Sequence, residues 1–312
     1  MEQERYLVTG AAGFIGSCVA RALLDLGHEV ITIDNLSTGK RDVVPPGCRF
    51  IHGNVQDAAI IEELRSVKFD AIIHIAGQSS GEISFEDPVY DLQTNAQSTL
   101  LLLNLARNTG CTKFVYASSM SVYGDHPENP KVCEETKTTP KSFYAVGKLA
   151  SENYMRIFSS MFGIHCTALR FFNVYGIGQN LDNLKQGMAS IYLAMALKDR
   201  HIIVKGAKDR FRDFVNVTDV VRAVLLSAEK GYGYHTYNVC TGIPTTVEEV
   251  IAQICTNIGD HVRVDYVAGP PGDQHGIYGA FSTIEQAFGW RPETDFKTGI
   301  RQMVAWAKEV MR

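Results

Sequence analysis

The sequence predicts an α/β protein built on a doubly wound parallel sheet, with a smaller C-terminal α/β lobe. Short apolar runs alternate with longer helical patterns through about the first 170 residues, and strands this apolar are typical of a parallel sheet covered on both faces. A glycine-rich turn separates the first run from the first helical pattern. After Tyr175 the elements become shorter and mixed, which indicates the second lobe.

The elements follow from periodicity and from residue type. Strands are expected at residues 6–9, 30–34, 49–52, 71–75, 113–118 and 166–172, and helices at about 14–26, 89–108, 143–161 and 297–310. We expect residues 1–174 to form the first domain, with part of 212–242 returning to it. Residues 175–312 should form mainly the second lobe, which closes over the carboxyl edge of the sheet, where such folds bind ligands.

The composition is that of a globular protein, with 312 residues, 45% hydrophobic and 21% charged. A net charge of −4 without a long basic run argues against a nucleic-acid groove. No apolar stretch approaches the ~18 residues of a membrane span, and the charged start argues against a signal peptide. The seven cysteines never form a Cys-x-x-Cys pair, so we expect a reduced, cytoplasmic protein without disulfides or a metal site.

Gly10, Gly13 and Gly16 lie between the first strand and the first helix, as in a Rossmann fold. Without a Cβ they allow a tight turn and the close approach of a pyrophosphate to a helix N-terminus. Asp34 ends the second strand, where its carboxylate can accept hydrogen bonds from both ribose hydroxyls of adenosine. The turn therefore predicts NAD in preference to NADP, although Lys40-Arg41 follows closely. The simpler alternative is a glycine turn that only joins strand to helix.

Tyr144 and Lys148 lie four residues apart on a predicted helix, 25 residues after Ser119. We expect the Lys148 ammonium and a bound nicotinamide to lower the pKa of Tyr144 from its usual value of about 10. Lys148 can also bind the nicotinamide ribose, and Ser119 can bind the substrate oxygen that Tyr144 deprotonates. The pattern predicts a redox site next to a dinucleotide. The simpler alternative is a buried tyrosine and a solvated lysine.

Six motifs in order carry a family resemblance. They are Thr9-Gly-Ala-Ala-Gly-Phe-Ile-Gly16, His74-Ile-Ala-Gly77, Ser118-Ser-Met-Ser-Val-Tyr-Gly124, Tyr144-x-x-x-Lys148, Arg170-Phe-Phe-Asn-Val-Tyr-Gly176 and Arg212-Asp-Phe-Val215. From about residue 5 to 290 the chain resembles the extended short-chain dehydrogenase/reductase superfamily, and within it the nucleotide-sugar epimerase/dehydratase branch. The resemblance implies tightly held NAD, a nucleoside-diphosphate sugar as substrate, most often a UDP-sugar, and a homodimer formed by the helices near 89–108 and 143–161.

The resemblance also implies a set of contact residues. For the cofactor these are Gly10, Gly13, Phe14, Ile15, Gly16, Asp34, Asn35, Ser37, Thr38, Gly39, Asn54, Val55, Ile75, Ala76, Gly77, Gln78, Asn95, Tyr144, Lys148 and Phe171. For the substrate they are Ser79, Ser119, Met120, Ser121, Asn173, Gln186, Gly187, Arg212 and Asp273. Arg212 is expected to bind the diphosphate through its guanidinium fork, and its simpler alternative is an ion pair with Asp209 or Asp213.

The residues after the fifth strand bear on the reaction. Dehydratases of the branch carry Thr-Asp-Glu where this chain has Ser119, Met120 and Ser121. Met120 cannot transfer a proton and Ser121 is a poor general base, so the resemblance favours a UDP-sugar 4-epimerase with a transient 4-keto intermediate over a 4,6-dehydratase. A 4-keto reductase remains an alternative, although Asp34 disfavours NADPH. A 3,5-epimerase-reductase would need a further acid–base pair, to which Cys133 can contribute.

Two further alternatives stay open at this point. A non-catalytic NAD-sensing regulator could use the same scaffold, although such proteins often lose the tyrosine or the lysine. The sugar also stays open between glucose, N-acetylglucosamine and glucuronate, within the synthesis of polysaccharide precursors. Pro270 stands where many epimerases have a diphosphate-binding arginine, and Ile277 stands at the position that makes room for an N-acetyl group. Compensating or additional charges are available from Lys185, Lys205, Lys208 and Arg210.

Overall fold

The computed structural model describes residues 3–183, 187–269 and 275–311. Two compact units make up the chain. The first comprises the chain up to residue 124 together with 138–170 and 221–237, and the second comprises 125–137, 171–220 and 238 onward. Residues 125–137 fall within the range expected for the first domain, but they group with the second unit because strand β6 (Lys131–Val132) pairs there with β14 (Tyr278–Gly279).

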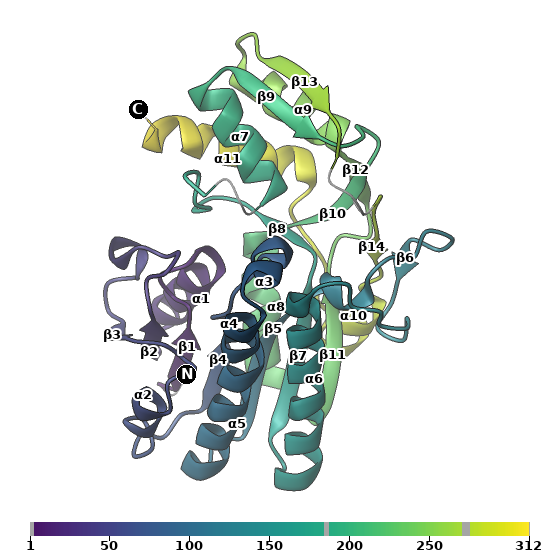
Figure 1. Ribbon diagram of the computed structural model, residues 1–312. Coiled ribbons are helices and arrows are strands. Elements are labelled where there is room, and N and C mark those ends of the chain that lie inside the picture. The colour runs from purple at the N-terminus through teal and green to yellow at the C-terminus, as the bar shows by residue number, and fades with distance from the viewer. Residues whose placement is uncertain (1–2, 184–186, 270–274, 312) are drawn as a thin grey trace. The chain divides into compact units, whose positions relative to one another are not determined.

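A seven-stranded sheet in the order β11-β7-β5-β4-β1-β2-β3 confirms the predicted doubly wound fold (Figure 1). β1 pairs in parallel with β2 on one side and with β4 on the other, so the strand order reverses at β1. Ligands bind such sheets outside the carboxyl ends of the strands at this reversal. The strands are β1 Arg5–Thr9, β2 Glu29–Asp34, β3 Arg49–His52, β4 Ala71–His74, β5 Lys113–Ser119, β7 His165–Phe171 and β11 Tyr234–Val239.

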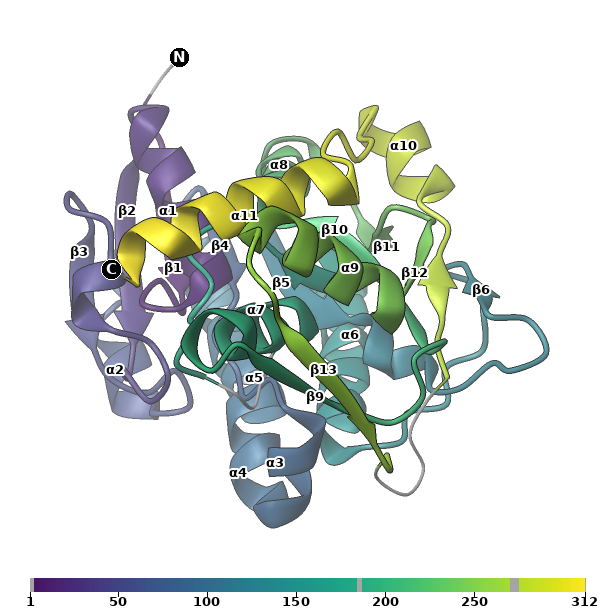
Figure 2. The same cartoon turned by 90° about the horizontal axis from the view of Figure 1, so that it is seen from above.

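Helices cover both faces of this sheet, as Figure 2 shows from above. Helices α1 (Phe14–Asp25) and α8 (Val217–Lys230) lie on one face, and α2 (Ala58–Glu62), α5 (Ser98–Thr109) and α6 (Phe143–Phe162) lie on the other. A continuous apolar core fills the space between the sheet and the second group. It includes Leu7, Ile31, Ile72, Phe114, Leu102, Leu103 and Met155. Two short helices, α3 (Gly81–Glu86) and α4 (Pro88–Leu92), precede α5, and short 3-10 turns span Arg41–Val43 and Met120–Tyr123.

The single helix expected over residues 89–108 is interrupted by a π-helical turn over Gln93–Gln97, between α4 and α5. The wider turn leaves the Asn95 carbonyl oxygen free to accept side-chain donors. It accepts from Ser151 Oγ at 2.6 Å, from Thr99 Oγ1 at 3.1 Å and from Tyr116 Oη at 3.4 Å. The turn is thus held by α6 and β5, which also carry the candidate catalytic residues.

The second unit has its own core and three small sheets. Strands β8 (Asn173–Tyr175), β10 (Phe211–Asn216) and β12 (Pro244–Thr246) form one sheet, β9 (His201–Lys205) pairs with β13 (Arg263–Val267), and β6 pairs with β14. Helices α7 (Met188–Lys198), α9 (Val247–Ile258) and α11 (Phe296–Val310) pack around a core that contains Leu193, Val250 and Val304 (Figure 2). Helix α10 (Ser282–Phe288) completes the unit. Among the described residues, no helix is long and apolar enough to cross a membrane.

Candidate active site

The glycine turn has the shape that a pyrophosphate site needs. Gly10 has φ +79°, and a Cβ on Gly16 would lie 2.1 Å from the Gly10 carbonyl oxygen, so α1 packs directly on the turn. Gly13 is the N-cap of α1, where no side chain caps the helix and the first turn holds no acidic residue. The N–H groups and the positive end of the helix dipole are therefore available to an anion. This turn fits the diphosphate of NAD.

Asp34 is held beside this turn at the end of β2. Its Oδ2 accepts from the Ala12 N–H at 3.0 Å and its Oδ1 accepts from the Leu36 N–H at 2.8 Å. Each carboxylate oxygen keeps a further lone pair for a ribose hydroxyl. The Arg41 guanidinium, which would favour a 2′-phosphate, lies 4.3 Å from the centre of the Phe50 ring. The arrangement therefore suits the unphosphorylated ribose of NAD.

The rest of the predicted adenosine region lies close to Asp34. Asn35 Nδ2 donates to Asn54 Oδ1 at 2.7 Å, so the loop after β2 contacts the segment after β3. A Cβ on Gly39 would lie 2.5 Å from the Ala12 carbonyl oxygen, so this loop also packs on the glycine turn. The structure thus brings the predicted residues 34–39, 54–55 and 10–16 together at one edge of the sheet.

A buried chain of hydrogen bonds shapes the end of β4. Thr9 Oγ1 accepts from the Ile75 and Ala76 N–H groups, each at 3.1 Å, so its own hydrogen points to His74 Nδ1 at 2.8 Å. His74 Nε2 then donates to Ser98 Oγ at 3.1 Å. Burial and the nearby Lys148 charge lower the pKa of His74 to about 3, so the imidazole is neutral. Sequence reasoning assigned no separate role to Thr9 or His74, although each begins one of the six motifs and is a polar residue in an apolar strand.

The three candidate catalytic side chains converge within the first unit. Tyr144 and Lys148 lie one turn apart on α6, and Ser119 ends β5, where its side chain acts on the proton affinity of the Tyr144 hydroxyl. Lys148 is only 4% exposed. Its Nζ donates to the Ala117 carbonyl oxygen at 2.9 Å, and it lies 5.6 Å from the centre of the Tyr144 ring and 4.7 Å from that of Tyr116.

Burial dominates the proton affinities at this cluster. Burial raises the pKa of Tyr144 to about 12. The Ser119 side chain lowers this pKa, and the Asp91 charge raises it further. Burial lowers the pKa of Lys148 to about 8, while Asp91 and Glu152 act in the opposite direction. The sequence predicted that Lys148 and a bound nicotinamide together lower the pKa of Tyr144. That prediction concerns the site with NAD bound and stays a prediction, while burial alone acts in the opposite direction because it disfavours a phenolate.

The segment after β4 lies against Lys148. A Cβ on Gly77 would lie 2.6 Å from Asn95 Oδ1 and 3.4 Å from Lys148 Nζ, so only glycine fits. Asn95 Nδ2 donates to the Gln78 carbonyl oxygen at 2.9 Å. Asn95 Oδ1 is buried and has no donor among the residues that the structure describes. A buried acceptor without a donor costs free energy, so it suits a hydroxyl of a bound ligand such as the nicotinamide ribose.

Met120 and Ser121 follow Ser119 in a 3-10 turn. Ser119 Oγ donates to Ser121 Oγ at 3.1 Å and accepts from the Ser121 N–H at 3.2 Å. Neither residue carries a carboxylate. The turn therefore orients the hydroxyl of Ser119, and Met120 and Ser121 contribute no strong acid or base to the site.

Of the remaining predicted substrate residues, Ser79 belongs to the first unit and the others belong to the second, as does the predicted cofactor residue Phe171. Asn173 begins β8 and its Oδ1 is buried without a donor among the described residues, while Phe171 is buried at the end of β7. Arg212 Nη1 donates to the carbonyl oxygens of Phe211 and His275 at 2.7 and 3.2 Å. Gly187 precedes α7 with φ +88°. Gln186, Asp273, Pro270 and Lys185 lie outside the described residues.

The other candidates of the second unit have local partners. The exposed Lys208 pairs with Glu248 at 2.9 Å, and the Arg210 guanidinium donates to the carbonyl oxygens of Ala207 and Lys205. Cys133 Sγ lies 3.6 Å from Thr136 Oγ1. No acid–base partner for this thiol appears among the contacts that the structure describes.

A buried ion pair behind the catalytic cluster escaped sequence reasoning. Glu152, one turn after Lys148 on α6, accepts from Arg170 Nε at 3.0 Å and from Arg170 Nη2 at 2.8 Å. It also accepts from Ser118 Oγ at 2.6 Å, next to the candidate catalytic serine. The sequence signals for this pair were the four-residue spacing of Glu152 from Lys148 and the position of Arg170 at the start of one of the six motifs.

Comparison with known proteins agrees with this site. Residues 6–240 match the profile of the NAD dependent epimerase/dehydratase family. The UDP-glucose 4-epimerase of Mycolicibacterium smegmatis is 32% identical over 306 residues, which cover 96% of this chain and 97% of that protein.

Two solved structures are similar to this chain over nearly their whole length. The UDP-glucose 4-epimerase of Thermotoga maritima with UDP-glucose gives a TM-score of 0.95 at 30% identity, covering 99% of this chain and 100% of that chain. The UDP-glucose 4-epimerase of Thermus thermophilus in complex with NAD gives 0.90 at 35% identity, covering 97% and 99%. The predicted fold class and family resemblance are thereby confirmed.

Proposed function

This chain belongs to the NAD-dependent epimerase/dehydratase family, and on that premise we propose that it is a UDP-sugar 4-epimerase. The observation that carries the proposal is the convergence of Ser119, Tyr144 and Lys148 beside a turn that fits a dinucleotide. The residues next to Ser119 supply no carboxylate. This set of groups can move one proton at a sugar hydroxyl and cannot by itself remove water from the sugar.

Each residue has a defined part in the proposed reaction. NAD, held by the glycine turn and Asp34, would supply the hydride chemistry at C4 of the sugar. Tyr144 Oη accepts the proton of the 4-hydroxyl and later gives it back, and Ser119 Oγ donates a hydrogen bond to the same sugar oxygen. Lys148 stays protonated and stabilises the phenolate form of Tyr144, whose pKa burial otherwise raises to about 12.

The NAD site is proposed to consist of the glycine turn, Asp34 with its loop, and the segment after β4. Asn95 Oδ1 and Lys148 Nζ would bind the nicotinamide ribose, since both lie beside Gly77. In the second unit, Asn173 and Arg212 are proposed to bind the sugar nucleotide, where the fork of Arg212 suits a diphosphate. The seven free cysteines are consistent with the reducing cytoplasm, where UDP-sugars would serve as polysaccharide precursors.

The test is to incubate the purified protein with UDP-glucose, UDP-N-acetylglucosamine or UDP-glucuronate, with and without NAD, and to follow the anomeric protons by NMR. We expect galacto-configured product from one of them, reduced by at least about a hundredfold in Tyr144→Phe. Tyr232→Phe, at an exposed tyrosine, is the matched control. A 4-keto, 6-deoxy product would mean that the enzyme dehydrates the sugar. If none of the three UDP-sugars is converted, the proposal that this chain is a UDP-sugar 4-epimerase is not supported.

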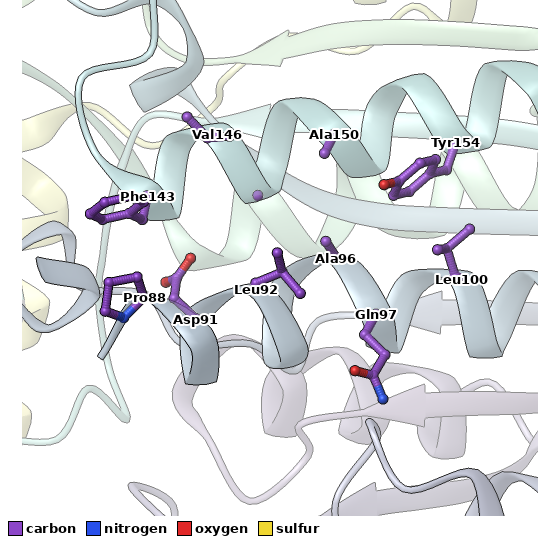
Figure 3. Close-up of a pocket in the computed structure, with 11 residues that line it drawn as sticks. Pro88, Asp91, Leu92, Ala96, Gln97, Leu100, Phe143, Val146, Ala150 and Tyr154 are labelled. Atoms are coloured by element: carbon purple, nitrogen blue, oxygen red, sulfur yellow. The ribbon is translucent and has the colours of Figure 1, made fainter. Parts of the chain in front are cut away.

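We also propose a homodimer through α4, α5 and α6. Figure 3 shows the segment α4–α5 beside α6, with apolar side chains along the groove between them. Val89, Leu92 and Val146 are 66%, 58% and 50% exposed, and Phe85 packs edge-on against Phe143 at 5.7 Å, at one end of the groove. A contiguous apolar face of this kind is unfavourable in water and is typical of a subunit interface.

Sedimentation equilibrium tests the dimer. The double variant Leu92→Glu/Val146→Glu places charges on this face and is expected to sediment as a monomer. Ile243→Glu, at an exposed apolar residue of the second unit, should leave the mass unchanged. A dimer that survives the double variant would show that another surface forms the interface.

A further inference from the structure

Asp91 is a buried carboxylate that the proposed reaction does not use. It lies on α4 and is 1% exposed, and in Figure 3 it points from the floor of the groove toward α6. A Cβ on Gly147 of α6 would lie 3.5 Å from Asp91 Oδ2, so the carboxylate sits directly against the turn of α6 that precedes Lys148. A charge this deeply buried is costly unless it has partners.

The hydrogen bonds of Asp91 lead to the cofactor side of the site. Its Oδ1 accepts from Gln78 Nε2 at 2.8 Å and from Asn95 Nδ2 at 3.1 Å. Asn95 Nδ2 also donates to the Gln78 carbonyl oxygen, so the three residues form one closed cluster. The second oxygen, Oδ2, has no hydrogen-bond donor among the residues that the structure describes. Burial raises the pKa of Asp91, whereas the two amides and the Lys148 charge lower it. Oδ1 thus holds the two amides, whereas Oδ2 accepts no hydrogen bond from the described residues.

Asp91 supplies the larger of the two carboxylate charges that act on Lys148. Glu152, the other one, is paired with Arg170 through two hydrogen bonds and has the smaller effect on Lys148. The remaining titratable groups that face Lys148 carry no charge at neutral pH. They are His74 on β4, Tyr116 on β5 and Tyr144 on α6.

We propose that Asp91 is a positioning residue of the active site, which keeps Lys148 charged and fixes Gln78 and Asn95 beside it. The proposal deepens the proposed function, since it concerns the same site. Asp91 acts from the groove side of the helices, at the base of the face proposed to form the dimer. It touches neither substrate nor reacting atoms and works through Lys148.

A neutral residue at position 91 has a predictable effect on Lys148. Burial already lowers the pKa of Lys148 to about 8, and Asp91 is the larger of the two charges that oppose this. Without that charge the ammonium is less favoured, so its pKa falls further, by about one unit for an opposite charge at close range. Lys148 then loses its proton near neutral pH. The basic limb of the pH–rate profile moves to lower pH by the same amount.

Asp91→Asn tests the proposal, because it removes the charge and keeps an oxygen that accepts from Gln78 and Asn95. Asp87→Asn, at an exposed residue that caps the same helix, is the matched control, since asparagine caps as well as aspartate. The first readout is acetic anhydride labelling of Lys148 across a pH series, quantified by peptide mass spectrometry. The second is NAD binding over the same series, and the third is the pH–rate profile.

We expect the labelling midpoint of Lys148 to fall by about one pH unit in Asp91→Asn and to stay at the wild-type value in Asp87→Asn. Asp91→Glu, which restores the charge, should return it toward the wild type. Equal midpoints in Asp91→Asn and the wild type would overturn the proposal. If Asp91→Asn does not fold, Asp91→Ser takes its place in the same comparison. Labelling needs no sugar, so a failure of the epimerase proposal would leave this result interpretable.

Discussion

Replacing Glu152 by glutamine should destabilise the protein far more than its single lost charge suggests. The side chain keeps its size, and one oxygen can still accept a hydrogen bond. Its new NH₂ group, however, faces the Arg170 guanidinium, which is itself buried. The arginine then loses its carboxylate partner and keeps the Tyr123 hydroxyl, to which its Nη1 donates at 2.9 Å.

The magnitude follows from the number of bonds and from burial. Glu152 accepts three hydrogen bonds, two of them from a charged donor, and both partners of the pair are at most 6% exposed in their side chains. Removing one member of such a pair costs about 3–5 kcal/mol, because the remaining charge stays buried without compensation. In a unit of this size the melting temperature should fall by roughly 10 °C.

The assay is denaturant or thermal unfolding of four proteins, namely the wild type, Glu152→Gln, Arg170→Met and the double variant. We expect the double variant to be more stable than the sum of the single changes predicts, since it leaves neither charge alone. Glu248→Gln breaks the exposed Lys208–Glu248 pair and should leave the free energy of unfolding close to that of the wild type, because solvent screens such a pair. It is the matched control.

The reasoning is refuted if Glu152→Gln unfolds within about 1 kcal/mol of the wild type. Such a result would mean that water or a rearranged side chain reaches Arg170. Additive effects in the double variant would also contradict it, because two residues in direct contact would then behave as independent sites.

Two further predictions concern the cofactor side. Gly16→Ala places a Cβ 2.1 Å from the Gly10 carbonyl oxygen, so the turn must open, and the purified protein should lose most of its NAD, measured as absorbance released on denaturation. Gly81→Ala, where the nearest atom is 3.8 Å away, should keep it. The second prediction concerns pH. His74 has a pKa of about 3 when folded and 6.5 when unfolded, so below pH 6.5 the unfolded state binds a proton that the folded state does not. Stability should therefore fall by about 2 kcal/mol from pH 6.5 to pH 5, as measured by urea unfolding, and His74→Gln should flatten this slope. An unchanged slope in that variant would assign the pH dependence to other groups.

Local sequence patterns were sufficient to predict six of the seven strands of the first unit's large sheet and helices α1, α5 and α6, but not β11, α2, α3 or α8. Strand β2 was expected at residues 30–34 and runs over Glu29–Asp34, and α6 was expected at about 143–161 and runs over Phe143–Phe162. These segments are long or strongly apolar, so their burial reinforces local propensity. The π-helical turn at Gln93–Gln97 was not predicted. It depends on Ser151 and Tyr116, donors that are distant in sequence.

The candidate site divides in the same way. Glycines at fixed spacing, an acidic residue at a strand end and a tyrosine four residues before a lysine are local patterns, and together they specified the type of chemistry. The environment of those groups is set by residues from other elements. Burial raises the pKa of Tyr144, and the spacing of Tyr144 and Lys148 along the chain gave no sign of this effect.

The sequence by itself therefore determined the fold class, the dinucleotide turn and the three groups proposed for proton transfer, since each is encoded by residue type and spacing within one or two elements. Only the tertiary structure decided which charges Lys148 meets. Asp91 and Glu152 both act on it, but Glu152 is paired with Arg170 from β7, and Asp91 has the larger effect on Lys148. Coulomb interactions depend on distance and burial in three dimensions, and one-dimensional spacing carries neither.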